Sequence, residues 1–143
     1  MNGMTARNEY ALITGASAGL GAEFARQLAA AGHNLILVAR REDRLSALAG
    51  ELRAAHKIDC QLVIADLSEP GAGAQIRSTC VSSGWQVSWL INNAGVAGPD
   101  LLKDRDWAAQ LTFFQLMMLS VADLCHRVIP DMAERGYGRV INV

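Results

Sequence analysis

The stretch from Thr14 to Gly21, TGASAGLG, constrains the fold of this chain more than any other feature. It separates a short apolar run at 10–13, typical of a buried strand, from a segment rich in helix formers at 22–31. Glycines on a turn from a strand into a helix let the backbone approach a ligand closely. The free N–H groups and the positive dipole end of such a helix favour a pyrophosphate. The context therefore predicts a nucleotide-binding loop; a tight turn that needs glycines only for packing is the alternative.

Further apolar runs follow this loop at regular intervals, and helical patterns separate them. We expect strands at 34–39, 61–65, 87–91 and 139–143, and helices at 22–31, 45–55, 70–83 and 107–134. The buried faces of the first two helices are predicted to carry Leu20, Phe24, Leu28 and Ala31 in one, and Leu45, Leu48, Ala49, Leu52 and Ala55 in the other. Pro130 is expected to bend or break the last helix near its end.

The alternation of these elements predicts the fold class. Strands that are apolar throughout and alternate with helices indicate a parallel sheet covered on both faces. Right-handed crossovers and a phosphate loop after the first strand predict a doubly wound α/β sheet in the order 3-2-1-4-5, a Rossmann fold. No linker, internal repeat or low-complexity tract interrupts residues 1–143. We expect one nucleotide-binding domain, or a part of one that is truncated after its fifth strand.

Composition excludes several other classes of protein. The formal net charge is -1 and no basic cluster is interleaved with aromatic residues, so we expect no nucleic-acid partner. The first nine residues lack the apolar core of a signal peptide, and the uncharged run at 111–122 is too short to span a bilayer. Cys60, Cys80 and Cys125 form an odd set without C-x-x-C spacing, which is typical of reduced thiols in a cytoplasmic protein. The histidines are scattered, and no metal site is predicted.

Four segments should meet at one edge of the predicted sheet. Ligands of doubly wound sheets bind beyond the carboxyl ends of the strands. The glycine loop, Arg40, Asp66-Leu67 and the segment 92–95 all lie there. Taken singly, Asp66 could be a helix cap or turn residue, and Asn93 could sit in a turn that bonds its own backbone. Their joint placement favours a single binding site.

The residues at this edge resemble the cofactor motifs of the classical short-chain dehydrogenase/reductase family. The matching motifs are TGxxxGxG from Thr14, Asp66-Leu67 and the NNAG of 92–95, and 130–143 also resembles the family's run into its fifth strand. The resemblance implies NAD(P)-dependent oxidation of an alcohol or reduction of a carbonyl in a small-molecule substrate. It implies that Gly15, Ser17, Ala18, Gly19, Leu20 and Gly21 hold the pyrophosphate and the neighbouring ribose. It also implies that Asp66 and Leu67 flank the adenine, and that Asn93, Ala94 and Gly95 line the path to the nicotinamide ribose.

The end of the second strand predicts which cofactor is preferred. An acidic residue there would bind the ribose 2′-hydroxyl and select NAD. This chain has Arg40, with Arg41 next to it. A guanidinium can pair bidentately with a 2′-phosphate, which predicts NADP in preference to NAD. A solvated arginine that opens a helix is the alternative.

The chain departs from the family pattern in its catalytic residues. The family's serine and its Tyr-x-x-x-Lys pair lie beyond the fifth strand, and neither Tyr10 nor Tyr137 has a lysine four residues later. Met117 stands where many members carry an asparagine in the long helix, and plain core packing is its simplest interpretation. We assign no catalytic residue, and we interpret the chain as an N-terminal fragment of such an enzyme, inactive alone. The alternatives are a non-catalytic NADP-binding or regulatory module and a sugar-nucleotide epimerase, for which a different glycine spacing is expected.

The last predicted helix is apolar over most of its circumference. One stripe comprises Trp107, Leu111, Phe114, Met118, Val121, Cys125, Ile129 and Met132, and Phe113, Leu116, Met117, Leu124 and Val128 widen it. Such a helix is stabilised by burial on more than one side, and the sheet can cover only one. Similar helices in the family pack against a partner subunit. We therefore expect a homodimer or homotetramer, and we expect the fragment alone to associate or aggregate.

Overall fold

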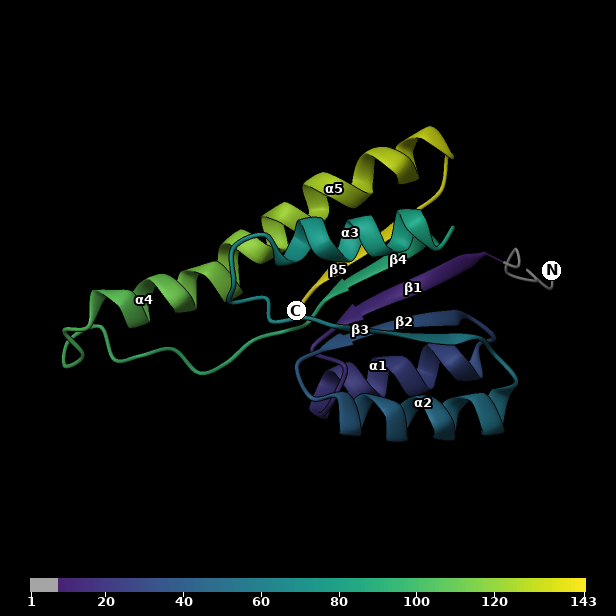
Figure 1. The fold of residues 1–143 in the computed structure, drawn as a ribbon, viewed down its shortest axis with the longest axis horizontal. Coiled ribbons are helices and arrows are strands. Elements are labelled where there is room, and N and C mark those ends of the chain that lie inside the picture. Colours follow the sequence, from purple (N-terminus) through teal and green to yellow (C-terminus); the bar gives the residue numbers. More distant parts are fainter. Residues whose placement is uncertain (1–7) are drawn as a thin grey trace.

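A single parallel sheet forms the centre of the molecule (Figure 1). The computed structural model describes residues 8–143. The strands are β1 (Glu9–Thr14), β2 (Asn34–Ala39), β3 (Cys60–Ile64), β4 (Gln86–Asn92) and β5 (Arg139–Asn142). They pair in the order β3-β2-β1-β4-β5, so the predicted topology is confirmed. The third strand begins and ends one residue earlier than predicted.

Helices cover both faces of this sheet, as Figure 1 shows. The helical elements are α1 (Gly19–Ala30), α2 (Glu42–His56), α3 (Ala72–Ser82), α4 (Trp107–Phe114), the π-helical turn η1 (Gln115–Leu119) and α5 (Ser120–Glu134). One hydrophobic core lies between the sheet and the pair α1 and α2. A second core lies between the sheet and the pair α3 and α5. The two cores account for the continuous apolar character of the strands.

The buried face of α1 differs from the predicted one. Ala22, Ala25 and Ala29 are buried, whereas Leu20 is 62% exposed and the side chains of Phe24 and Leu28 are only partly buried. These alanines pack in the core that α1 shares with β1 and β2, where close packing admits small side chains. In α2, the leucines at 45, 48 and 52 are buried with Ala49 as predicted, but Ala55 is exposed in the last turn.

The segment predicted as one helix from 107 to 134 contains the turn η1, which the sequence pattern did not indicate. Behind this turn, the Ser120 hydroxyl donates to the Leu116 carbonyl at 2.6 Å. Pro130 lies inside α5, which continues to Glu134, so of the two expected effects it does not break the helix. The ring is on the exposed side of the helix, so the carbonyl that loses its N–H partner can bond to water.

The sheet and α3 cover only one face of the 107–134 segment. Leu124, Val128 and Met132 are buried there, while half of the predicted stripe is exposed, including Trp107 at 63% and Met118 at 62%. By length and composition alone, these 28 residues could cross a membrane, with a window of mean hydropathy 1.4. The sequence analysis considered only the uncharged run at 111–122 and judged it too short to span a bilayer. In this fold, the segment packs into the layer that covers the sheet.

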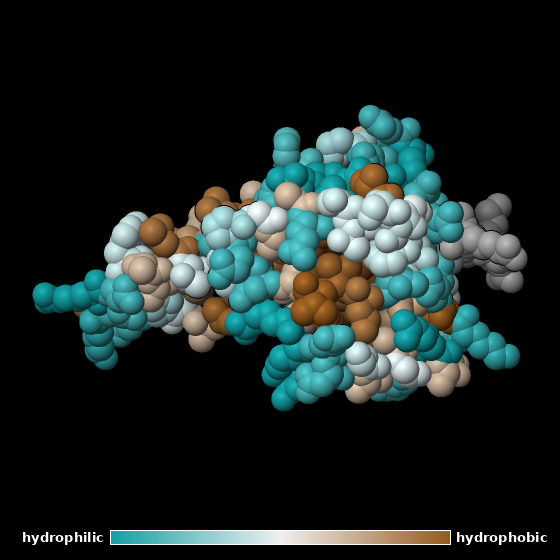
Figure 2. Space-filling model, viewed as in Figure 1, coloured by the Kyte–Doolittle hydropathy of each residue, from teal (hydrophilic) through white to brown (hydrophobic). Residues whose placement is uncertain are grey.

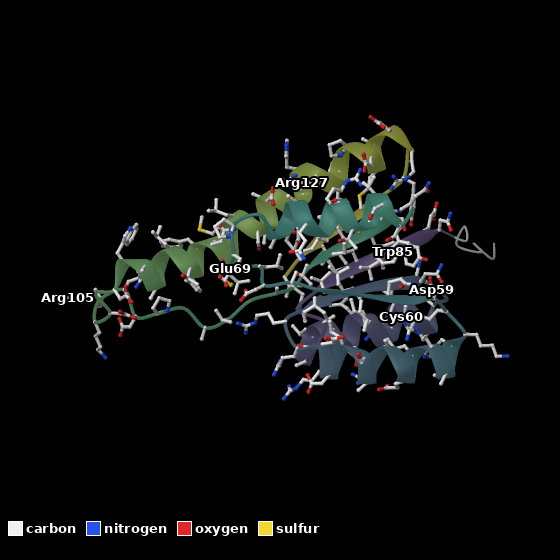
Figure 3. The ribbon with its side chains drawn as sticks, in the orientation of Figure 1. Asp59, Cys60, Glu69, Trp85, Arg105 and Arg127 are labelled. Carbon is white, nitrogen blue, oxygen red and sulfur yellow. The ribbon has the colours of Figure 1, made fainter. Side chains whose placement is uncertain are left out.

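The exposed apolar residues gather in two places. Figure 2 shows apolar side chains along the arm that α4 forms, and an apolar patch in the middle of the same view. At the edge strand β3, Ile64 is 39% exposed. The end of the sheet away from the arm carries Asp59 and Trp85 (Figure 3), where the Tyr10 hydroxyl donates to Asp59 at 2.6 Å. This hydrogen-bonded end is remote from the carboxyl ends of the strands.

Candidate functional site

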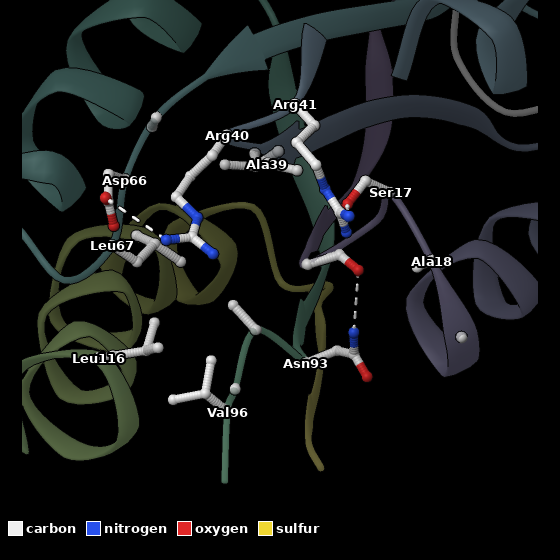
Figure 4. A pocket seen from close by; sticks show the side chains of 16 residues that line it. Ser17, Ala18, Ala39, Arg40, Arg41, Asp66, Leu67, Asn93, Val96 and Leu116 are labelled. Atoms are coloured by element: carbon white, nitrogen blue, oxygen red, sulfur yellow. Dashed lines mark hydrogen bonds and ion pairs between the residues drawn. The ribbon is translucent and has the colours of Figure 1, made fainter. Parts of the chain in front are cut away.

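A cleft of about 280 Å³ opens at the carboxyl ends of the central strands (Figure 4). The structure brings most of the predicted site residues together there, namely Gly15, Ser17, Ala18, Gly19, Arg40, Asp66, Leu67, Asn93, Ala94 and Gly95. The lining also includes Val38, Ala39, Arg41, Ala65, Val96 and Leu116. Leu20 and Gly21 do not line the cleft. The predicted meeting of four separate segments at one edge of the sheet is thus found in the structure.

A buried threonine holds the two central segments of the cleft together. Thr14, which is 1% exposed, accepts hydrogen bonds at Oγ1 from the backbone N–H groups of Asn93 and Ala94, both at 3.0 Å. Its hydroxyl also donates to the Ile91 carbonyl at 3.4 Å. The side chain of Asn93 donates from Nδ2 to the carbonyls of Thr14 at 3.1 Å and of Gly15 at 3.3 Å. Asn93 therefore binds the glycine loop, not its own backbone.

Two glycines of the loop are required by close contacts. Gly15 has φ +64°, and a Cβ on it would lie 2.8 Å from the Ala94 Cα. A Cβ on Gly21 would lie 2.3 Å from the Gly15 carbonyl oxygen. Gly21 therefore lets α1 approach the loop closely, and it does not line the cleft. This is the packing role that the sequence left as an alternative, and here it applies to one glycine of the motif.

The amino-terminal end of α1 points its backbone N–H groups toward the cleft region. Ala18 is the N-cap in an extended conformation, and among the described residues no side chain caps the helix. Its first turn also holds no acidic side chain. Because Ser17, Ala18 and Gly19 line the cleft, an anion placed there would meet these N–H groups and the positive end of the helix dipole.

Two arginines from the end of β2 lie over the cleft (Figure 4). Arg40 Nη1 is 3.9 Å from Asp66 Oδ2, and Arg41 Nη2 donates to the Ser17 hydroxyl at 3.2 Å. The side chain of Arg40 is 67% exposed, so it is free to reorient toward a ligand. The sequence analysis noted Arg41 only as a neighbour, and its bond to the glycine loop depends on the tertiary fold.

Asp66 combines a turn role with a place in the cleft. The Ser68 hydroxyl donates to Asp66 Oδ1 at 2.6 Å, and the Ser68 backbone N–H donates to the same oxygen at 2.9 Å. These bonds, with the hydroxyl bond as the largest cause and Arg40 as a smaller one, lower the pKa of Asp66 below 3.8 although partial burial opposes them. The carboxylate is therefore ionised at neutral pH, next to the exposed guanidinium of Arg40.

The side of the cleft near η1 is apolar and was not predicted. Val96, which is 48% exposed, and Leu116 form this wall. Met117 lies behind it, with Sδ 3.2 Å from the position that a Cβ on Gly95 would take. This contact supports the packing interpretation of Met117. The sequence analysis placed Leu116 only on the broad apolar surface of the 107–134 helix, and its place in the cleft comes from the tertiary structure.

Metal ligation and thiol chemistry have little support in the part of the chain that the structure describes. Within residues 8–143, no three side chains of His, Cys, Asp or Glu form a cluster that could hold a metal ion. The three cysteines are free. Burial raises the pKa of both Cys60 and Cys80 to about 11, so these thiols stay protonated.

The fold and the cleft define a class of protein. A doubly wound parallel sheet, with a glycine-rich turn leading into a helix beside the cleft, is a nucleotide-binding domain of the Rossmann type. A sequence model of the family described as short chain dehydrogenase matches residues 9–143. The chain therefore belongs to the short-chain dehydrogenase family.

Named relatives agree with this assignment. The chain is 33% identical over 135 residues to sulfoacetaldehyde reductase 2 of Chromohalobacter salexigens, covering 94% of this chain and 53% of that protein. It is 30% identical over 135 residues to 7beta-hydroxysteroid dehydrogenase of Collinsella aerofaciens, covering 94% and 51%. A short-chain dehydrogenase from Sphingobium yanoikuyae, solved in complex with NADPH, superposes with a TM-score of 0.85 at 32% identity, covering 94% and 52%. The chain thus spans about half the length of the relatives it matches.

Proposed function

We propose that this chain is the cofactor-binding part of an NADP-dependent oxidoreductase that acts on an alcohol or a carbonyl compound. The observation that carries the proposal is the cleft at the carboxyl ends of the strands, where the glycine loop and two arginines converge. When bound, the nicotinamide supplies or accepts a hydride. The residues of this chain bind and orient the dinucleotide, and family resemblance assigns the proton transfer to residues that this chain does not match.

Each part of the cleft suits one part of a dinucleotide. The loop from Gly15 to Gly19 and the uncapped end of α1 would hold the pyrophosphate. Asp66 and Leu67 would flank the adenine. Asn93, whose side chain is already bonded to the loop, would keep the 93–95 segment along the path to the nicotinamide ribose. Gly21 lets α1 approach the loop, and Leu20 is exposed outside the lining.

The preference for NADP is supported by the charges at the end of β2. Arg40 and Arg41 stand where an acidic side chain would bind a ribose 2′-hydroxyl, and both line the cleft. A 2′-phosphate would replace Asp66 as the partner of Arg40 and would find Arg41 beside it. The NADPH named for the Sphingobium structure is consistent with this choice.

Isothermal titration of the chain with NADPH and with NADH tests the proposal. We expect NADPH to bind more tightly, and we expect Arg40→Asp to weaken NADPH binding by about 10–100-fold, the equivalent of a lost charge-assisted hydrogen bond. The same variant should change NADH binding much less. Arg44→Asp on the exposed surface of α2 is the matched charge control. Equal or tighter binding of NADH by the unmodified chain would refute the preference.

The assembly and the location of the protein are part of the same proposal. The uncovered apolar face of the 107–134 segment supports a homodimer or homotetramer, and it supports self-association of the chain alone. Three free cysteines support a reducing, cytoplasmic location. Light scattering at micromolar concentration tests the first point, since a clean monomer would contradict self-association.

A further inference from the structure

The turn that follows β3 holds the Asp66 carboxylate by only one of its two oxygens. The Ser68 hydroxyl and the Ser68 backbone N–H both donate to Oδ1, at 2.6 Å and 2.9 Å. Among the residues that the structure describes, none donates a hydrogen bond to Oδ2, and Arg40 Nη1 lies 3.9 Å from it. This separation is beyond hydrogen-bond distance. Oδ2 therefore keeps its capacity to accept a hydrogen bond from a ligand.

The backbone on both sides of Asp66 is fixed by other contacts. The Ala65 N–H donates to a carbonyl at the end of β2 at 3.1 Å, which joins the ends of the two strands. The Glu69 N–H donates to the Asp66 carbonyl at 3.1 Å, which closes the turn. Leu67 is 5% exposed and packs in the core between the sheet and the pair α3 and α5. Because the backbone is held in this way, the bonds from Ser68 decide the direction in which Oδ2 points.

The oxygen Oδ2 belongs to the part of the cleft that is assigned to the adenine. Asp66 and Leu67 line the cleft, and Figure 4 shows the carboxylate at its edge, beside Arg40. The bond from the Ser68 hydroxyl is the largest cause of the lowered pKa of Asp66, so the carboxylate is ionised at neutral pH and can only accept hydrogen bonds. A purine with an amino group at position 6 offers this oxygen a donor. A purine with a carbonyl at that position presents a second acceptor instead.

We propose that Ser68 is a positioning residue for the base of the dinucleotide: it occupies Oδ1 of Asp66 and thereby directs Oδ2 toward the 6-amino group of adenine. The inference rests on the proposed function, because it concerns the choice of base at the same cleft. Ser68 does not line the cleft and acts only through Asp66. Loss of its hydroxyl removes the shorter of the two bonds to Oδ1, so the carboxylate is free to rotate and Oδ2 is no longer held in place.

Two cofactors that differ only in the base measure this role. NADPH carries adenine, whereas reduced nicotinamide hypoxanthine dinucleotide phosphate carries a carbonyl in place of the 6-amino group. Calorimetric titration of the chain gives a Kd for each. We expect the unmodified chain to bind NADPH about 10-fold more tightly or better, as is usual for a hydrogen bond to a charged group. Ser68→Ala should reduce this ratio by at least about 3-fold, and Ser68→Thr, which keeps a hydroxyl, should preserve it.

The ratio of the two Kd values separates positioning from a general loss of order in the turn, which would weaken both cofactors alike. Asp66→Asn should invert the ratio, because Ser68 would hold the carboxamide oxygen and leave Nδ2 to donate to a 6-carbonyl. Ser82→Ala is the matched control. The Ser82 hydroxyl donates to the Thr79 carbonyl at 3.1 Å at the exposed end of α3 and touches nothing in the cleft, so its loss should leave the ratio unchanged. Circular dichroism of each variant checks that it is folded.

The outcomes keep this inference apart from the proposed function. A folded chain that binds neither cofactor would refute the proposed function, and the positioning role with it. A chain that binds both cofactors with equal Kd would refute the positioning role alone. A folded Ser68→Ala variant that keeps the full ratio would do the same, as would a Ser68→Thr variant that loses the ratio as completely as Ser68→Ala.

Discussion

Replacing Thr14 with valine tests the hydrogen bonds that join the glycine loop to the end of β4. The change keeps the shape of the side chain and removes its hydroxyl. The N–H groups of Asn93 and Ala94 would lose their acceptor, and the Ile91 carbonyl would lose a long hydrogen bond. The two N–H groups are only partly buried, so the lower part of the usual penalty applies to each.

We expect Thr14→Val to lower the free energy of unfolding by about 2–4 kcal/mol and Tm by about 6–14 °C. NADPH binding should also weaken, because Asn93 and Ala94 line the cleft. Thermal unfolding followed by circular dichroism measures the first effect, and calorimetric titration measures the second.

Ser88→Ala is the matched control for this prediction. Ser88 is also a buried hydroxyl between β1 and β4, 3% exposed, and donates to the Tyr10 carbonyl at 3.3 Å. It lies at the other end of the strand pair and touches nothing in the cleft. We expect it to lower Tm less and to leave NADPH binding unchanged. A Thr14→Val variant as stable as Ser88→Ala, with normal NADPH affinity, would contradict the reasoning.

Three further predictions follow from single sites and from the chain as a whole. Gly21→Ala should destabilise the fold by about 1–3 kcal/mol, because its Cβ would clash with the Gly15 carbonyl. Gly50→Ala, in open space on α2, should instead stabilise the fold by about 0.5–1 kcal/mol. Urea unfolding measures both changes. Because the pKa of Asp66 is lowered in the folded chain, its ionised form stabilises the fold above pH 3.8. This contribution is lost as the pH falls through the lowered pKa. Ser68→Ala removes the hydroxyl that donates to Asp66, so the Tm difference between the unmodified chain and this variant should shrink in acid. Residues 1–143 should bind NADPH and yet show no carbonyl-dependent NADPH oxidation, because a missing general acid typically lowers the rate by about 10²–10⁴; turnover that disappears in a Gly19→Leu variant would overturn this.

The sequence alone determined the topology and the location of the site. The order β3-β2-β1-β4-β5 was predicted from apolar strands that alternate with helices, from the right hand of parallel crossovers and from the phosphate loop after the first strand. Once that order is set, Arg40, Asp66 and Asn93 must meet, because each follows the carboxyl end of a strand in one sheet. The strand order and the meeting of these residues were predicted from local sequence patterns, namely apolar runs, helical periods and the glycine loop.

Only the tertiary structure decided how these residues are connected. The bonds from Asn93 to the loop join residues 78 and 79 positions apart, and the bond from Arg41 to Ser17 joins residues 24 apart. Small residues on α1 are buried against the sheet in place of Leu20, and Leu116 in the π turn η1 lines the cleft. Periodicity describes regular elements one at a time, whereas close approach and a π turn arise from the packing of several elements against one another.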